Sequence, residues 1–340
     1  MGSGISKSSF DRRPVENSSV MKSSDEYHDP EKSIYKNIGN TGNPQPSGAA
    51  MKIHINPKAS DQRDKDEFTF INKINVKAST DEKDCFIESM ALVSSNKLAI
   101  VDNYNRTLKV VDTDNKTIKK AMKFQSSPFG ITTISCDQVA VTFPKECKIE
   151  IVSTSEDISL VETLKTNGSC LGICFKNEKL YVSYLPMPPN IPIKFQILRL
   201  TGAVQKTIRP DSEVLKYSTY PSCIAVSPEE NSVFVSDWKC HKVFCIDMDG
   251  NMLSMYQDEL EHPSDIFMSL LGSVYLLNKG QHLLYEVKSD LSEATVLLGI
   301  GDGLAFPNAM CFNLYKQHLY ISAGSDSAKL NNEIKVYIWK

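Results

Sequence analysis

Two stretches of this 340-residue chain share one pattern, and that pattern decides the fold. Residues 98–112 read LAIVDNYNRTLKVVD, and residues 233–247 read VFVSDWKCHKVFCID. In both stretches an apolar run ends in an Asp, a polar turn follows, and a second apolar run leads to another Asp. Short apolar runs bounded by turn residues indicate β-strands joined in a hairpin. Helical periodicity is not sustained beyond residue 66, so we expect an all-β domain.

The hairpin belongs to a unit that recurs six times along the chain. The units begin with six short runs: Ser89-Met90, Gly130-Ile131, Gly172-Ile173, Cys223-Ile224, Asp265-Ile266 and Ala309-Met310. The second residues of these runs are 41, 42, 51, 42 and 44 positions apart. A repeat of about 40–45 residues with four strands is typical of a propeller blade. A β-sandwich gives no reason for this spacing and solenoid coils are shorter, so the sequence predicts a six-bladed β-propeller.

The ends of the repeat region predict how the ring closes. The sixth unit supplies three strands before Lys340, which leaves its outer edge bare. Residues 68–76 read FTFINKINV and form one spare strand ahead of the first unit. Because an exposed strand edge promotes aggregation, we expect this spare strand to pair with the last blade. The propeller is therefore predicted to span residues 66–340, and a truncation that removes residues up to 76 should damage it.

Residues 1–65 have a different composition, rich in Ser, Asn, Lys, Asp, Pro and Gly. Such a segment buries too little apolar surface to offset its ordering entropy, so a disordered arm is predicted. The chain begins MGSGISK, which fits the N-myristoylation pattern with Gly2 as the acceptor, although an unmodified flexible start explains it as well. One myristoyl chain gives only marginal, reversible membrane binding, so any membrane attachment is expected to be weak.

Composition narrows the compartment and the cofactors. Nine cysteines occur singly, without the paired Cys-x-x-Cys spacing of a structural zinc site. The polar start of the chain lacks an apolar secretory segment, so reduced thiols and a cytoplasmic location are expected. The net charge of −3 gives no broad attraction to nucleic acid or anionic lipid. We predict neither a metal site nor a cofactor.

The two opening stretches resemble the NHL-repeat pattern, in which an Asp ends the second strand of a blade. Residues 301–307, GDGLAFP, resemble the link between blades in that family. Residues 66–340 as a whole resemble the C-terminal propeller of tripartite-motif proteins, in a divergent form because blades two, three and five lack the Asp. The resemblance implies the substrate-recognition end of a ubiquitin ligase. The RING and B-box modules are missing, since residues 1–84 contain no Cys.

The leading functional hypothesis is a non-enzymatic scaffold or adaptor for protein partners, connected with the ubiquitin pathway. Strand order in a propeller brings the loops between second and third strands and the links between blades to one face. Trp, Tyr and Arg are the side chains that most often anchor protein interfaces. The residues predicted for this binding face are Tyr104, Arg106, Phe129, Leu185, Met187, Trp238, Lys239 and His241.

Two alternatives stay open. Calcium-dependent lactonases and arylesterases place carboxylate and amide ligands at inner strand ends, where Glu88, Asp265 and Asn308 lie here. Glu88 and Asn308 stand two residues before the second residue of their runs and Asp265 stands one before it, so strand alternation should turn Asp265 in a different direction from the other two. Some NHL propellers bind RNA, but residues 1–64 hold nine basic and eight acidic residues, which leaves 29 and 33 in the propeller region. That net charge of −4 disfavours a contact led by phosphate.

Overall fold

Each sequence repeat folds into a four-stranded antiparallel sheet in the computed structural model, which describes residues 68–186, 192–323 and 332–339. From the innermost to the outermost strand, blade one holds β2 (Ile87–Ser94), β3 (Lys97–Asp102), β4 (Thr107–Asp112) and β5 (Thr117–Lys123). Blade two holds β6 (Ile131–Ser135), β7 (Gln138–Phe143), β8 (Lys148–Ser153) and β9 (Ser159–Lys165). Blade three holds β10 (Cys170–Lys176), β11 (Lys179–Tyr184), β12 (Lys194–Arg199) and β13 (Val204–Ile208).

The other three blades follow the same order. Blade four holds β14 (Pro221–Val226), β15 (Ser232–Asp237), β16 (Lys242–Asp247) and β17 (Met252–Met255). Blade five holds β18 (Pro263–Met268), β19 (Val274–Asn278), β20 (Leu283–Val287) and β21 (Ala294–Leu298). Blade six holds β22 (Pro307–Asn313), β23 (His318–Ala323), β24 (Glu333–Trp339) and β1 (Phe68–Asn75).

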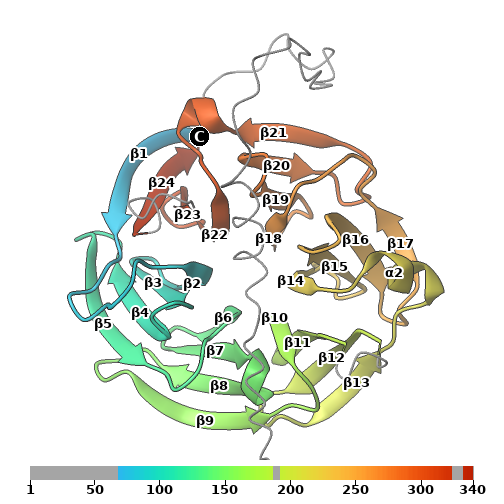
Figure 1. The fold of residues 1–340 in the computed structure, drawn as a ribbon, viewed down its shortest axis with the longest axis horizontal. Coiled ribbons are helices and arrows are strands. Elements are labelled where there is room, and N and C mark those ends of the chain that lie inside the picture. The colour runs from blue at the N-terminus through green and yellow to red at the C-terminus, as the bar shows by residue number, and fades with distance from the viewer. Residues whose placement is uncertain (1–67, 187–191, 324–331, 340) are drawn as a thin grey trace, which may run out of the picture. The chain divides into compact units, whose positions relative to one another are not determined.

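The six sheets stand in a ring around a common axis, which confirms the predicted six-bladed propeller (Figure 1). Closure is also as predicted, because β1 pairs antiparallel with β24, with Phe68 opposite Trp339 and Ile74 opposite Ile334. The first described strand is thus the outer edge of the last blade. This pairing covers the edge that the sixth repeat would otherwise expose.

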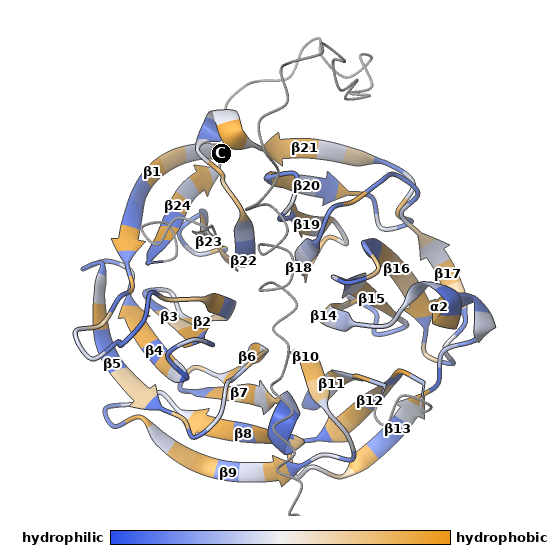
Figure 2. Cartoon of the chain, viewed as in Figure 1, coloured by the Kyte–Doolittle hydropathy of each residue, from blue (hydrophilic) through white to orange (hydrophobic). Residues whose placement is uncertain are grey.

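The core lies between neighbouring blades. The second and third strands of the blades are covered on both faces, and they therefore read as nearly continuous apolar runs (Figure 2). Ile100 of blade one and Tyr320 of blade six, for example, belong to one buried cluster. The outer strand β5 instead alternates between exposed and partly buried residues, as expected for a strand with one face in solvent.

Buried hydroxyl groups connect consecutive blades near the axis. In three blades a Ser or Thr on the second strand donates a hydrogen bond to a backbone carbonyl at the start of the next inner strand. The pairs are Thr142 Oγ1 to Leu171 O (2.7 Å), Ser183 Oγ to Pro221 O (2.7 Å) and Ser236 Oγ to Pro263 O (2.8 Å). These bonds satisfy buried carbonyls and fix the spacing of the inner strands around the channel.

Three short helices, α2 (Ser212–Tyr217), η2 (Pro144–Glu146) and η3 (Ile300–Asp302), lie at the face turned toward the viewer in Figure 1. In the part of the chain that the structure describes, no helix combines the length and apolar character needed to cross a membrane. The predicted arm of residues 1–65, including Gly2, and the predicted binding residue Met187 lie outside the described residues.

Candidate interaction face and central channel

One end of the propeller carries the loops between second and third strands together with the links between blades. We call this end the linker face. The structure places seven predicted residues there: Tyr104 and Arg106 between β3 and β4, Phe129 before β6, Leu185 after β11, and Trp238, Lys239 and His241 between β15 and β16. Arg106 and Lys239 are exposed, whereas the other five are partly buried. The predicted residues thus share one face, although they are spread over four blades.

The two large aromatic residues of this face are held by stacking. Tyr104 stacks on Phe86, with ring centroids 5.0 Å apart and an interplanar angle of 22°. Trp238 stacks on His262, with centroids 4.6 Å apart at 28°. Each ring uses one face inside the molecule, so these side chains are fixed before a partner arrives. A fixed ring loses less conformational entropy on binding than a free one.

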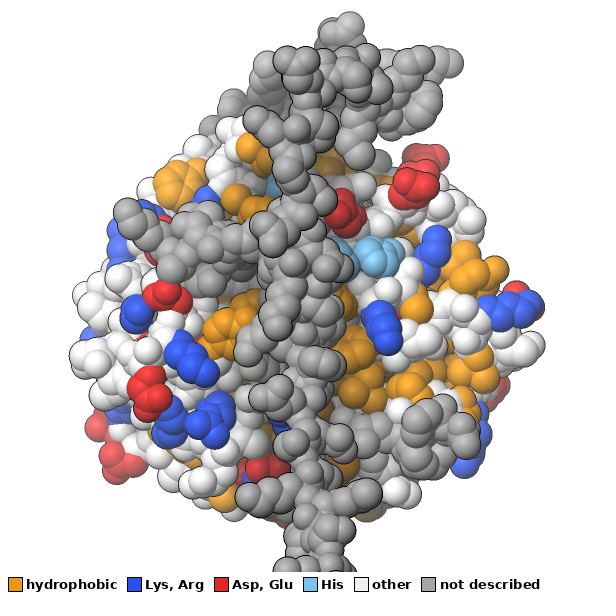
Figure 3. Space-filling model, in the orientation of Figure 1, with side chains coloured by type: hydrophobic (Ala, Val, Ile, Leu, Met, Phe, Trp, Pro, Cys, Tyr) orange, Lys and Arg blue, Asp and Glu red, His pale blue; other side chains and the backbone are white. Residues whose placement is uncertain are grey.

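Phe129 and Leu185 are also held in place by contacts within the propeller. Phe129 packs edge-on against Tyr220, with centroids 6.4 Å apart. The backbone N–H of Leu185 donates to Ser169 O at 2.9 Å, which fixes the chain where it leaves β11. Apolar side chains are visible on both sides of the middle of the linker face, and histidine side chains lie in the part of this face that blades four and five form (Figure 3).

Two histidines accept hydrogen bonds from the links between blades and hold those links in place, a role that the sequence did not reveal. His241 Nδ1 accepts from the backbone N–H of His262 at 3.1 Å, and His282 Nδ1 accepts from Phe306 N at 2.9 Å. Both imidazoles must be unprotonated at Nδ1 to accept, and burial lowers the pKa of His282. The available signal was positional, because each histidine follows the last residue of a second strand, Asp237 or Asn278, by four positions.

The most exposed large apolar side chains lie on the opposite end, which we call the hairpin face because it carries the turns between first and second strands. Leu270 and Leu271 in the β18–β19 turn are 78% and 97% exposed. Tyr315 in the β22–β23 turn is 82% exposed. These residues belong to adjacent blades and were not among the predicted binding residues.

The Asp that ends the second strand in blades one and four has a structural role. Asp237 accepts hydrogen bonds from Thr219 N at 2.7 Å, Tyr220 N at 2.6 Å and Cys240 N at 2.8 Å. Its carboxylate therefore joins the link that precedes the blade to the loop that follows its second strand. Blade five has Asn278 at this position, and Asn278 Oδ1 accepts from Glu261 N at 3.2 Å.

In blade one the corresponding Asp102 is part of a buried ionic cluster. Asp81, Cys85 and Asp102 bring potential metal-ligand atoms within 4.8 Å of one another. The buried Lys109 ammonium already occupies this cluster, with Nζ 2.6 Å from Asp81 Oδ2, 2.8 Å from Asp102 Oδ2 and 3.2 Å from Cys85 Sγ. Burial alone would lower the pKa of Lys109, but attraction to Asp102 and the hydrogen bonds with both carboxylates raise it. The cluster is thus a cation site filled by the protein's own lysine.

The second candidate site is the central channel. It contains a cavity of about 410 Å³ lined by the inner strands of all six blades. Most of its wall is apolar or sulfur-containing, with Met90, Cys174, Phe267 and Met310 among the lining residues. Cavities of this size and polarity are typical of small-molecule sites.

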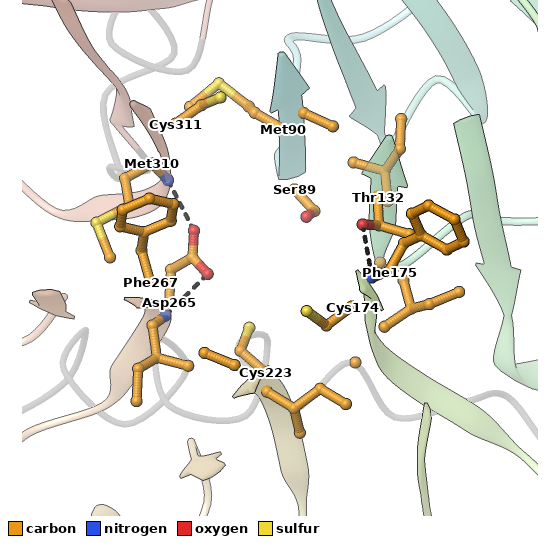
Figure 4. Close-up of a pocket in the computed structure, with 18 of the residues that line it drawn as sticks. Ser89, Met90, Thr132, Cys174, Phe175, Cys223, Asp265, Phe267, Met310 and Cys311 are labelled. Carbon is orange, nitrogen blue, oxygen red and sulfur yellow. Dashed lines mark hydrogen bonds between the residues drawn. The ribbon is translucent and has the colours of Figure 1, made fainter. Parts of the chain in front are cut away.

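Asp265 is the carboxylate that points toward the middle of this cavity, together with Ser89, Cys174 and Cys223 (Figure 4). Asp265 Oδ1 accepts from Ile266 N at 2.9 Å, and Oδ2 accepts from Met310 N at 2.8 Å. Burial raises the pKa of Asp265 to about 7, even though these N–H groups favour the ionised form. The carboxyl group therefore keeps its proton at higher pH than an ordinary Asp does.

The expected orientation of the three candidate calcium ligands is partly wrong. Asn308 does not line the cavity, because its Nδ2 donates to Ile87 O at 2.7 Å and its Oδ1 accepts from Lys279 Nζ at 3.3 Å. Glu88, however, lines the cavity together with Asp265. The pairing of the first and second strands shifts register at the same place in blades one, five and six, so simple strand alternation does not apply to these three residues.

The sequence was compared with models of known protein families, and none matches; a comparison with curated proteins gives no match either. Function must therefore be inferred from the fold and from the geometry of the linker face and the channel.

Proposed function

We propose that this propeller is a non-enzymatic protein-interaction module that recognises its partner through the linker face. The observation that carries the proposal is the set of pre-positioned aromatic side chains on that face, Tyr104 on Phe86 and Trp238 on His262. Rigid Tyr and Trp side chains near an exposed arginine such as Arg106 are the composition of interface hot spots. The links and loops that carry them are held by buried hydrogen bonds, as the Asp237 contacts illustrate.

The resemblance to NHL propellers agrees with this proposal and suggests the kind of partner. Residues 98–112 and 233–247 carry the NHL-like pattern, and Asp102 and Asp237 make the structural contacts that a blade of that type needs. We infer a divergent NHL-type propeller that acts as an adaptor, with a partner connected to ubiquitin ligation.

The calcium-dependent hydrolase has less support. Calcium requires six to eight oxygen ligands. Both Asp265 oxygens already accept backbone N–H groups, and the Asn308 amide is engaged outside the cavity. Elemental analysis of the purified protein tests this alternative, since one tightly held calcium per chain would favour it over the adaptor.

The main test is affinity capture from cells of the source organism with wild-type protein and matched variants. Trp238→Ala and, because Lys239 is exposed, the gentler Lys239→Glu should each reduce the recovered partner about 10-fold or more, as expected for a hot spot. Tyr315→Ala is the control, because it removes an exposed aromatic side chain from the hairpin face. Melting temperatures verify that each variant is folded.

Two outcomes would contradict the proposal. If Tyr315→Ala abolishes capture while Lys239→Glu does not, the hairpin face carries the interaction. If the captured partners disappear after ribonuclease treatment of the lysate, the propeller is bound through RNA. In that case affinity should also fall steeply with salt.

A further inference from the structure

We propose that the central channel binds a small organic cation, a primary ammonium group on an apolar body, with Asp265 as its counter-ion. This site is separate from the linker face, and the proposal does not depend on the protein-binding function. It rests on the volume of the cavity, the chemistry of its wall and the placement of one carboxylate within it.

The wall suits an apolar body. Met90, Ile173, Ile224, Phe267 and Met310 all line the cavity of about 410 Å³. Thioether and aromatic side chains adapt their shape to an apolar ligand and form favourable contacts with a cation over a ring. Water in such a cavity finds few polar partners, so an apolar group gains by displacing it.

The charges that face the cavity favour a positive ligand. The titratable groups among the described lining residues are Glu88, Cys174, Lys176, Cys223, Asp265 and Cys311. Burial raises the pKa of Cys174 to about 11 and that of Cys311 to about 12, and it raises the pKa of Cys223 as well, so these thiols are neutral. The Lys176 ammonium is turned toward the hairpin face, where it donates to Ser227 O at 2.8 Å. Glu88 and Asp265 are therefore the acidic groups among these lining residues, and Asp265 is the one that points toward the middle of the cavity (Figure 4).

Among the residues that the structure describes, no lysine or arginine pairs with Asp265, although a buried carboxylate usually has such a partner. It is stabilised by two backbone N–H groups, and burial raises its pKa to about 7. An ammonium group beside it would favour the ionised form and recover the desolvation cost. Each oxygen accepts one hydrogen bond from the backbone and keeps a second acceptor position. Ser89 Oγ points toward the same space and offers a further acceptor (Figure 4).

An ammonium ion fits the remaining oxygen atoms better than a metal ion does. Thr132 Oγ1 accepts from Phe175 N at 3.1 Å, and Thr133 Oγ1 donates to Leu92 O at 2.8 Å. These hydroxyls are engaged in holding neighbouring blades together. An ammonium needs three acceptors at most, whereas calcium needs six to eight.

The experiment uses phenethylammonium and its neutral counterpart 2-phenylethanol as probes of the full-length protein, in buffer with EDTA at pH 7.5. Ligand-observed NMR or calorimetry should show one site that prefers the ammonium by about 10-fold or more, the gain expected for one desolvated charge pair. Asp265→Asn should remove this preference. Asp290→Asn, the same substitution in an exposed loop outside the cavity, should leave it unchanged.

If Asp265→Asn does not fold, a pH series on the wild-type protein still tests the proposal. Between pH 6 and pH 8 the affinity for the ammonium should rise about 10-fold as Asp265 ionises, while the affinity for the alcohol stays constant. Equal binding of the two probes, an affinity independent of pH, or an unchanged preference in Asp265→Asn would each overturn the proposal. So would a titration without EDTA in which Ca²⁺ binds more tightly than the ammonium and Asp265→Asn abolishes that binding.

Discussion

Two carboxylates of this propeller are removed from bulk water, and they are stabilised by different groups. Asp102, at the end of β3, is fully buried and lies 2.8 Å from the Lys109 ammonium, which it shares with Asp81. Asp265, on β18, lies at the wall of the channel and is stabilised by two backbone N–H groups and by the Cys223 thiol, none of which carries a full positive charge. One site carries its own cation, and the other has room for a cation from outside.

The difference teaches how to separate structural ionic groups from candidate ligand sites in a fold that has many of both. A buried charge that is neutralised within the chain holds elements together, as the Lys109 cluster does between the loop before β2 and strand β4. A buried carboxylate with a raised pKa and open space beside it is a candidate for ligand binding. If the proximity of potential metal-ligand atoms were the only criterion, the group Asp81, Cys85 and Asp102 would be chosen as the ligand site. The Lys109 ammonium already occupies that group.

The largest predicted effect comes from breaking the neutralised site. Lys109→Met keeps the shape of the side chain but leaves Asp81 and Asp102 without their cation in a buried place. Loss of one partner from a buried ion pair costs about 3–5 kcal/mol. Chemical denaturation should therefore show a fall of this size in the free energy of unfolding.

Two further variants sharpen this prediction. Adding Asp81→Asn to Lys109→Met should recover part of the loss, because one of the two uncompensated charges is removed. Lys216→Met is the matched control, since the Lys216–Glu213 pair is exposed and should contribute nothing measurable. If Lys109→Met were as stable as the control, charge neutralisation would not be what holds the cluster.

The second prediction concerns Asp265, for which ionisation of the carboxylate should lower the stability of the fold. The folded-state pKa of Asp265, about 7, exceeds the ordinary value of 3.8, so the native state binds more protons between these two values. Stability should therefore fall as pH rises from about 4 to about 7 and level off above that. A shift of this size corresponds to at most about 4 kcal/mol, and solvent access to the cavity reduces the expected fall to about 1–3 kcal/mol.

Denaturation at pH 5 and pH 8 measures this effect in wild type and in Asp265→Asn. The variant cannot ionise, so its stability should change less between the two pH values than that of the wild type. A saturating ammonium ligand should reduce the wild-type fall, because it stabilises the ionised native state. Identical pH profiles for wild type and variant would show that Asp265 does not lie in a desolvated position.

The sequence predicted the ring of six blades, but it did not predict the Lys109 cluster or the Asp265 site. The reason is physical. Blade spacing and the pairing of residues 68–76 with the last blade follow from local periodicity and from the need to cover an edge. The Lys109–Asp81 contact depends on the path of the loop between β1 and β2, which the closed ring determines. A lysine inside an apolar third strand was the available signal, since an unpaired charge does not stay buried.

Asp265 shows a second limit of sequence reasoning. Its position one residue before Ile266 was recognised, but its direction depends on the register shift between Pro263 and Asp265. A single-residue bulge reverses which side chains face the channel, and the sequence does not mark it. The placement of Tyr104 and Trp238 on one face was predictable, because it follows from strand order alone.

The smallest predicted effect concerns His282, a partly buried group that must stay neutral to accept its hydrogen bond. Burial lowers the pKa of His282 below its ordinary value of 6.5, so the unfolded chain binds more protons than the native state as pH falls below that value. Acid should therefore weaken the link that His282 Nδ1 holds through Phe306 N, at a cost of about 1 kcal/mol, the contribution of one hydrogen bond. His282→Asn keeps an acceptor at the same place, tolerates the left-handed backbone at φ 61° and does not titrate.

Denaturation at pH 7 and pH 5 in the Asp265→Asn background, which removes the opposing titration, should show a loss of stability that His282→Asn abolishes. A loss of equal size with His282→Asn would assign the acid sensitivity to another group, with His262, whose pKa burial also lowers, as the next to test.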